Sequence, residues 1–216
     1  DISHQVKTPI ANLKMFTGIL QNHALTPEQR TEFLGTMEGQ INKLDFLMQS
    51  LIKMSRLETG TFTLHMEEAR LSDTIAQAMS TVWARAEAKQ IELSAECDPA
   101  ITVQHDPKWT AEAIGNILDN AVKYTSAGGR VSMETYSDVR KFETEYAESH
   151  TEGKIEEDRH YFGFVVKDTG IGISANSITK VFDRFYRVND EDGEEHLGSG
   201  IGLALVRSLV LLHDGF

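Results

Sequence analysis

A row of apolar side chains in the first quarter of the chain constrains the fold most strongly. Its members recur at alternating spacings of three and four residues: Leu34, Met37, Ile41, Leu44, Met48 and Leu51. This seven-residue repeat predicts a helix of about thirty residues with one apolar seam. Because such a seam must be covered, we expect the helix to pack against other helices.

Local signals place the start of this helix at Pro27. Thr26 can cap the helix, Pro27 suits the first helical position, and Gln29 completes a capping box. A second apolar stripe predicts a partner helix upstream: Ile2, Val6, Ile10, Leu13, Phe16 and Leu20. Residues 1–58 are therefore predicted to form a helical hairpin. Two helices alone enclose little core, whereas two hairpins together can enclose the core of a four-helix bundle. We therefore predict a homodimer through residues 1–58, assembled as a four-helix bundle.

After residue 59 the pattern changes to alternating strands and helices, and we place a domain boundary there. Strands are predicted at 62–66, 91–95, 101–104, 130–136 and 161–168, and helices at 71–88, 107–124, 175–181 and 200–213. This order predicts an α/β sandwich over 62–216, so the fold class of the whole chain is α+β. The charged stretch 138–160 is predicted to be a long hairpin extension or loop.

Composition excludes several classes of protein. A single cysteine, Cys97, rules out an internal disulfide, and no Cys/His cluster has zinc-ligand spacing. The net charge of −12 disfavours nucleic acid as a partner. The first 59 residues carry six acidic and six basic side chains, so the net negative charge lies in residues 60–216. No apolar run approaches the roughly 20 residues that cross a bilayer, and we expect a cytoplasmic piece.

Four polar residues share one face of the predicted helix 107–124. Asn120, Lys123 and Tyr124 follow Asn116 at offsets of four, seven and eight residues, opposite an apolar face. An amide oxygen suits Mg²⁺ and an ammonium group suits phosphate. The alternative interpretation is the ordinary polar face of an amphipathic helix.

An acidic residue ends the predicted strand 161–168 and leads into a glycine-rich turn. Asp168 is followed by Gly170 and Gly172. Glycine lets the backbone approach a ligand, and a carboxylate can accept a hydrogen bond from an exocyclic amine. An ordinary strand-to-helix turn is the alternative.

A second glycine cluster, Gly198-Ser-Gly200-Ile-Gly202-Leu203, opens the last predicted helix. Backbone N–H groups at a helix N-terminus can bind phosphate. The spacing does not fit the dinucleotide-binding pattern GxGxxG, so that function is not supported.

Together, these motifs resemble the N, G1 and G2 boxes of the sensor histidine kinases. The segment Phe182-Asp-Arg-Phe185-Tyr-Arg187, between the glycine motifs, resembles the F box. The segment His4-Gln-Val-Lys-Thr8-Pro9 resembles the H box, and it lies on a helical hairpin as in that family. The resemblance covers nearly the whole chain. It implies that residues 62–216 bind ATP in the fold shared with Hsp90, gyrase B and MutL.

The resemblance also implies a role for each matching residue. His4 would be the phosphoacceptor, with Gln5 beside it, and Thr8 could orient water for dephosphorylating a response regulator. Asn120 would ligate Mg²⁺, Lys123 and Arg187 would meet phosphates, and Asp168 would recognise the adenine amine. The rest of the pocket and its lid would be Asn116, Tyr124, Gly170, Gly172, Gly198, Gly200, Gly202 and Leu203.

The reaction implied is autophosphorylation of His4 by ATP, followed by transfer to an Asp of a response regulator. Asn116 stands where the ATP-hydrolysing relatives carry a glutamate, and an amide cannot be a general base. Gln5 departs from the family, which usually has Glu or Asp after the histidine. Two alternatives stay open: a catalytically weak kinase acting mainly as a regulator phosphatase or scaffold, and a conformational ATPase.

The same resemblance implies parts of the protein outside this sequence. A sensor and any membrane spans would lie upstream of Asp1, with the full-length protein in the cell membrane. Because family members continue into further strands, the ATP-binding domain is expected to be truncated at Phe216.

Overall fold

A computed structural model describes residues 2–22, 24–58, 63–136, 162–187, 200–213 and 215. The chain divides into two compact units, which are described separately. One unit holds Asp1–Phe62 with Arg184–Ile201, and the other holds Thr63–Asp183 with Gly202–Phe216. The predicted extension at 138–160 lies outside the described residues. Within the described ranges, no helix combines the length and the apolar character needed to span a membrane.

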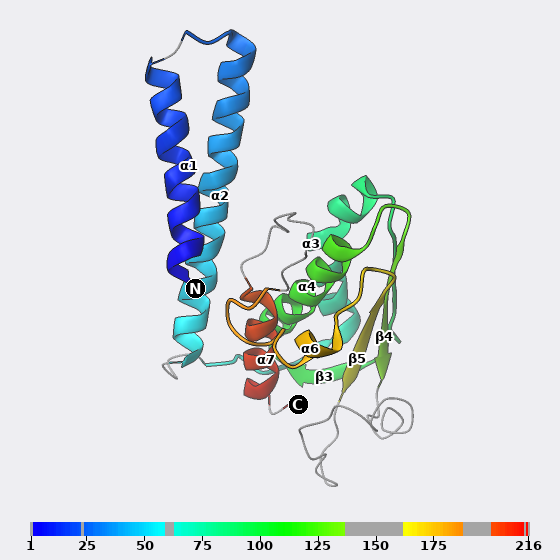
Figure 1. Ribbon diagram of the computed structural model, residues 1–216. Helices are drawn as coiled ribbons and strands as arrows, with labels where there is room; N and C mark the ends of the chain where they lie inside the picture. Colours follow the sequence, from blue (N-terminus) through cyan, green and yellow to red (C-terminus); the bar gives the residue numbers. More distant parts are fainter. Residues whose placement is uncertain are drawn as a thin grey trace. The chain divides into compact units, whose positions relative to one another are not determined.

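Two long helices, α1 (Ile2–Asn22) and α2 (Pro27–Glu58), form the hairpin of the first unit (Figure 1). The predicted capping box is present. The backbone N–H of Gln29 donates to Thr26 Oγ1 at 3.2 Å, and the N–H of Thr26 donates to Gln29 Oε1 at 3.1 Å. These two bonds satisfy N–H groups that a helix start leaves without partners, which explains why α2 begins at Pro27 as predicted.

The hairpin exposes part of the predicted apolar seam. Leu34, Ile41 and Met48 lie seven residues apart on α2 and are 52%, 54% and 52% exposed. We call these three residues the apolar row. Phe16 and Phe33 pack α1 against α2 with ring centroids 5.5 Å apart. One hairpin therefore covers part of the seam and leaves the apolar row facing outward.

Among the described residues of the second unit, five short strands form two sheets. The strands are β1 (Glu67–Arg70), β2 (Glu92–Glu96), β3 (Thr102–His105), β4 (Arg130–Tyr136) and β5 (Gly163–Asp168). β1 pairs antiparallel with β3. In the other sheet, β4 lies between β2, to which it is parallel, and β5, to which it is antiparallel.

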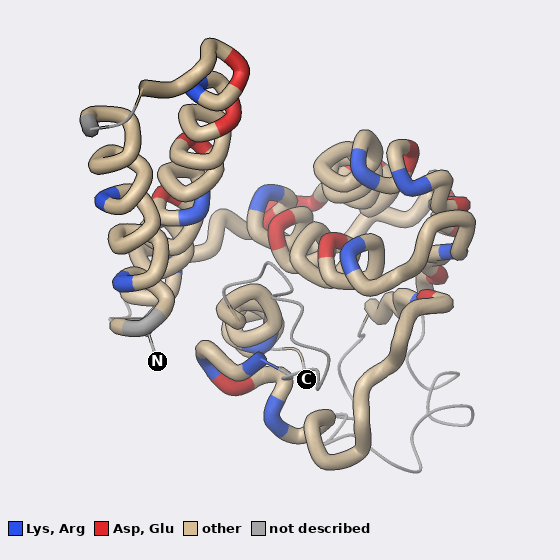
Figure 2. Tube along the Cα trace, turned by 45° about the horizontal axis from the view of Figure 1, so that its top comes forward, with Lys and Arg blue, Asp and Glu red and all other residues tan. Residues whose placement is uncertain are grey.

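Helices cover one face of the three-stranded sheet (Figure 1). They are α3 (Leu71–Ala88) and α4 (Pro107–Tyr124), with α7 (Gly202–Leu212) beside α4 and the short α6 (Ala175–Ile178) after β5. α3 and α4 bury Val82, Ile114, Leu118 and Val122 against Val131 and Met133 of β4. Charged residues of both signs also lie along these helices (Figure 2). The α+β class is confirmed.

Six predicted elements have other bounds in the structure: β1, β2, β3, β5, α6 and α7. β2 and β3 each lie one residue later than predicted, and β5 begins at Gly163 rather than 161. Residues 63–66 have no regular structure, and β1 begins at Glu67. Glu67 pairs with His105, which is the last residue of β3, and α4 begins two residues later at Pro107. The pairing between β1 and β3 therefore cannot extend to residues before Glu67. The N–H of His65 donates instead to Asp106 Oδ2 at 2.8 Å. α6 ends at Ile178 rather than 181. α7 begins at Gly202 rather than 200, since Gly200 has φ +65° and cannot continue a helix.

Candidate ATP-binding and phosphoacceptor site

The polar face of α4 carries the first group of predicted site residues. Asn116, Asn120, Lys123 and Tyr124 are all half-buried. The Asn116 amide donates from Nδ2 to the carbonyl of Glu112 at 2.7 Å, which fixes its orientation. A Cβ added at Gly202 would lie 3.0 Å from Asn116 Oδ1. Glycine at this position therefore allows the start of α7 to approach Asn116 closely.

The glycine turn after β5 packs on the C-terminal end of α4. Asp168 Oδ1 accepts a hydrogen bond from the N–H of Gly170 at 2.8 Å, and the N–H of Ile171 donates to the carbonyl of Tyr124 at 3.4 Å. A Cβ at Gly170 would lie 2.7 Å from Tyr124 O and 2.7 Å from Asp168 Oδ1. Gly172 has φ +72°. The structure thus brings Tyr124, at the end of α4, to Asp168 and Gly170 of the glycine turn, two motifs that are separate in the sequence.

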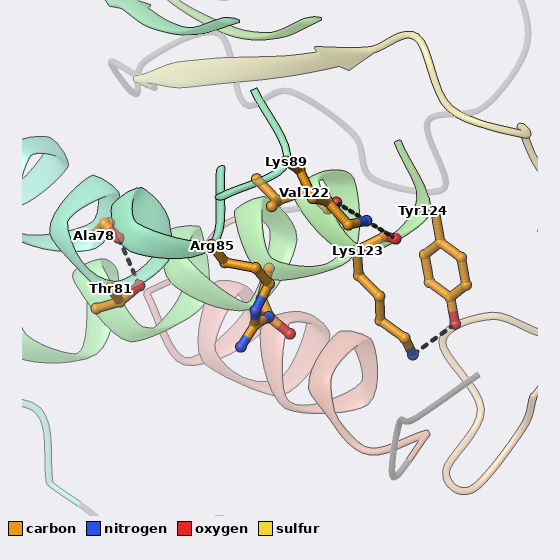
Figure 3. A network of polar contacts seen from close by, with 8 residues as sticks. Ala78, Thr81, Arg85, Lys89, Val122, Lys123 and Tyr124 are labelled. Atoms are coloured by element: carbon orange, nitrogen blue, oxygen red, sulfur yellow. Dashed lines mark hydrogen bonds and ion pairs between the residues drawn. The ribbon is translucent and has the colours of Figure 1, made fainter. Parts of the chain in front are cut away.

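Two further residues near this turn were missed by the sequence analysis. Thr125 is 1% exposed, and its Oγ1 has no hydrogen-bond partner among the described residues. Lys89 reaches the end of α4 from the turn after α3 (Figure 3). A lysine near the C-terminus of a helix is common in proteins. Its presence in the sequence does not predict which backbone carbonyls it would contact.

The segment that resembles the F box meets the second glycine motif. The N–H of Phe185 donates to the carbonyl of Gly200 at 2.8 Å. A Cβ at Gly200 would lie 2.7 Å from Tyr186 O, and its φ of +65° also favours glycine. Arg187 is half-buried. Gly198 lies outside the described residues, and Leu203 is half-buried at the start of α7.

The predicted phosphoacceptor lies on α1. His4 belongs to this helix, which continues without a break through Pro9. Thr8, one turn beyond His4, is half-buried. Gln5 Oε1 is buried and has no hydrogen-bond partner within the described part of the chain. Gln5 therefore has an acceptor oxygen available for a neighbouring donor.

The residues of the second unit suit a magnesium nucleotide. They comprise an amide at Asn120, an ammonium at Lys123, a carboxylate at Asp168, and backbone brought close by Gly170 and Gly202. Amide oxygens suit Mg²⁺, and cations with backbone N–H groups suit phosphates. These are the groups that a nucleotide-binding domain requires, and here the domain that carries them is joined to a helical hairpin.

Comparison with known proteins identifies the family. Residues 105–216 match the family of histidine kinase-, DNA gyrase B-, and HSP90-like ATPases, and residues 1–60 match the His Kinase A (phospho-acceptor) domain. The chain therefore belongs to the sensor histidine kinases, as the sequence motifs predicted. The first match is to a domain that binds ATP, and the second is to a phospho-acceptor domain.

One sequence relative agrees with this family, and two solved structures share the fold. The sensor protein GacS of Pseudomonas syringae pv. syringae is 28% identical over 212 residues, which cover 97% of this chain and 22% of GacS. The histidine kinase AdeS of Acinetobacter baumannii has a similar fold, with TM-score 0.69 at 16% identity, covering 97% of this chain and 86% of AdeS. The histidine kinase ThkA was solved in complex with the response regulator protein TrrA. Its fold matches with a TM-score of 0.64 at 17% identity, and the match covers 86% of this chain and 49% of the ThkA chain. This chain spans about a fifth of the length of GacS.

Proposed function

We propose that this chain transfers the γ-phosphoryl group of ATP to His4 and then to an aspartate of a response regulator. In this proposal residues 1–59 are the dimerisation and phosphotransfer hairpin, and residues 62–216 are the ATP-binding domain. The main support is the joining of Asp168, Gly170 and Tyr124 at the end of α4, because it combines a carboxylate with closely approaching backbone. ThkA, a protein of similar fold, was solved with a response regulator.

Each side chain has a proposed task in ATP binding. Asp168 accepts a hydrogen bond from the adenine amine, with its Oδ1 already held by Gly170. Lys123 and Arg187 bind phosphates, and Asn120 holds Mg²⁺ through its amide oxygen. The magnesium ion supplies positive charge that offsets charge on the transferred group. Asn116, whose amide is oriented by its bond to Glu112, cannot activate water as a general base, which favours transfer over hydrolysis.

The proposed chemistry at His4 is in-line displacement. A neutral imidazole nitrogen attacks the γ-phosphorus, the P–O bond to ADP breaks with its electron pair, and the resulting imidazolium loses a proton to solvent. Gln5 accepts a hydrogen bond from the other ring nitrogen, using the Oε1 that has no partner among the described residues. As an amide, Gln5 can orient the ring but cannot take its proton.

Further assignments concern the hairpin and the rest of the protein. We propose that the apolar row forms part of a homodimer interface, because Leu34, Ile41 and Met48 are about half exposed in one hairpin. Thr8 is proposed to orient water when the enzyme dephosphorylates its regulator, since it lies one helical turn from His4. The sensor and membrane-anchored parts are proposed to lie outside residues 1–216, because the chain covers 22% of GacS.

One experiment separates these functions. The chain is incubated with Mg-ATP that is radiolabelled at the γ position, beside a His4→Gln variant. We expect acid-labile, alkali-stable label on the unmodified chain and none on the variant. Stable label on the His4→Gln variant would show that His4 is not the phosphoacceptor. Continuous phosphate release without label would favour a conformational ATPase, and neither label nor release would favour a phosphatase or scaffold.

A further inference from the structure

Lys89 makes a three-point contact with the backbone at the end of α4. Its Nζ donates to the carbonyl oxygens of Val122, Lys123 and Thr125 at 2.9, 2.8 and 3.0 Å. Figure 3 shows the lysine reaching the backbone at Val122 and Lys123. An ammonium group has three N–H donors, so this one contact uses all of them.

This contact completes the hydrogen bonding of the α4 C-terminus. The last four carbonyls of a helix have no partner inside it. The carbonyl of Ala121 accepts from the N–H of Thr125 at 3.0 Å, and that of Tyr124 accepts from Ile171 at 3.4 Å. Lys89 serves the two carbonyls between them. It also places a positive charge at the negative end of the helix dipole.

The backbone of Lys89 is itself fixed. Its N–H donates to the carbonyl of Arg85 at 3.1 Å, and its carbonyl accepts from the N–H of Gly128 at 3.0 Å. Gln90 follows with φ +55° and ends α3. The ammonium group therefore approaches α4 from a turn that is bonded on both sides.

We propose that Lys89 is a positioning residue for phosphate binding by Lys123. By holding the backbone from residue 122 to 125, Lys89 fixes the point and direction from which the Lys123 side chain leaves α4. Without it, the carbonyls of Val122 and Lys123 lose their partners, and the last turn of α4 is free to fray. The inference rests on the proposed role of Lys123 in binding ATP phosphates.

A double-mutant cycle in the full chain tests this proposal. Binding of Mg-AMPPNP is measured by titration calorimetry for Lys89→Met, Lys123→Met and the double variant. Lys89→Met should weaken binding about tenfold, which corresponds to about 1.4 kcal/mol. In the Lys123→Met background the same change should have little further effect. Lys108→Met is the control, because it removes an exposed lysine from the other end of α4 and should leave affinity unchanged.

The possible failures are distinguishable. Unchanged affinity in Lys89→Met, or an equal loss in both Lys123 backgrounds, would overturn the positioning role while leaving the proposed function intact. Normal affinity in Lys123→Met would instead overturn the phosphate-binding role of Lys123, and this inference with it. Urea unfolding checks that each variant is folded. Should Lys89→Met not fold, Lys89→Gln, which keeps two N–H donors without the charge, takes its place in the same cycle.

Discussion

The Lys123 ammonium group is held by the side chain of the next residue. Its Nζ donates to the hydroxyl of Tyr124 at 3.0 Å and lies 4.5 Å from the centroid of the tyrosine ring (Figure 3). A cation over an aromatic ring is stabilised by the charge distribution of the ring. Any phosphate that binds Lys123 therefore competes with a contact that the protein already makes.

Removing the hydroxyl should relieve this competition. Tyr124→Phe keeps the aromatic ring and deletes the hydrogen bond, so we expect Mg-AMPPNP to bind roughly 2- to 10-fold more tightly, the value of one modest hydrogen bond. Lys123→Met should weaken binding in the same calorimetric titration. Weaker binding by Tyr124→Phe would show that the hydroxyl itself contacts the nucleotide.

The two glycines after Asp168 should differ in their tolerance of alanine. Gly170→Ala places a Cβ 2.7 Å from Tyr124 O, where backbone must shift, whereas Gly172 has open space but a φ of +72°. Alanine at Gly172 should cost about 1–2 kcal/mol of unfolding free energy, the penalty for left-handed backbone. The Gly170 variant should lose more and also bind nucleotide less tightly. Urea unfolding with calorimetry checks this order, and a larger loss at Gly172 would contradict it.

Features that depend on nearby residues could be predicted from the sequence. α4 has the predicted bounds because Asp106 caps it, accepting from the N–H of Trp109 at 3.1 Å, and Pro107 occupies its first position. Its regular spacing of apolar residues also identified the polar face with Asn116 and Asn120. These signals lie within one helix and need no knowledge of the rest of the fold.

Features that depend on distant partners could not be predicted. Lys89 donates to backbone carbonyls that lie 33–36 positions further along the chain. Because every residue has a backbone carbonyl, the sequence does not indicate which ones accept these hydrogen bonds. β1 was misplaced for the same reason, since its limits follow from pairing Glu67 with His105. The strand predicted at 62–66 has no partner strand among the described residues, and the sequence alone could not show this.

The capping box at the start of α2 should contribute measurably to local stability. Thr26→Ala removes an acceptor for the N–H of Gln29, and we expect exchange of the amide hydrogens at residues 28–30 to rise about fivefold, equivalent to about 1 kcal/mol. Thr31→Ala is the control, because the Thr31 hydroxyl bonds within the helix to Pro27 O. Equal effects of the two variants would contradict a capping role.

The same helix start should show a dependence on pH. A hydrogen bond from its own backbone N–H, then one from the Thr26 hydroxyl, hold the pKa of Glu28 below its ordinary value. A lowered folded-state pKa stabilises the fold above the unfolded-state pKa, and this stabilisation is lost as pH falls through the folded-state pKa. Local protection should therefore decrease in acid, and less steeply in Thr26→Ala. An identical pH profile for both proteins would argue against this coupling.

The apolar row should determine the association state. Ile41→Lys adds a charge to each of two symmetry-related sites, so the dimer dissociation constant should rise at least about 100-fold. Asn42→Lys adds the same charge at the next position, on a different face of α2, and should leave the dimer intact. Light scattering across a concentration series measures both. A monomeric unmodified chain at tens of micromolar, or equal effects of the two lysines, would contradict the proposed interface.

Gln5 offers the sharpest test of catalysis, because its Oε1 is buried with no partner in the described part of the chain. Gln5→Glu keeps the shape of the side chain and adds a carboxylate, which should stabilise the imidazolium that develops as the P–N bond forms. We expect faster autophosphorylation, toward the low end of the roughly 10²–10⁴-fold typical of proton-transfer assistance. The gain should lie in the chemical step, with ATP affinity unchanged.

The gain should also depend on pH in a defined direction. Burial raises the pKa of a carboxyl group, and only the ionised form can stabilise the imidazolium, so the advantage of Gln5→Glu should grow as pH rises through that pKa. Single-turnover phosphorylation at saturating Mg-ATP measures the rate at each pH. Gln21→Glu, an exposed change of the same charge on α1, serves as the control. An equal or slower rate for Gln5→Glu at every pH would mean that proton removal does not limit transfer to His4.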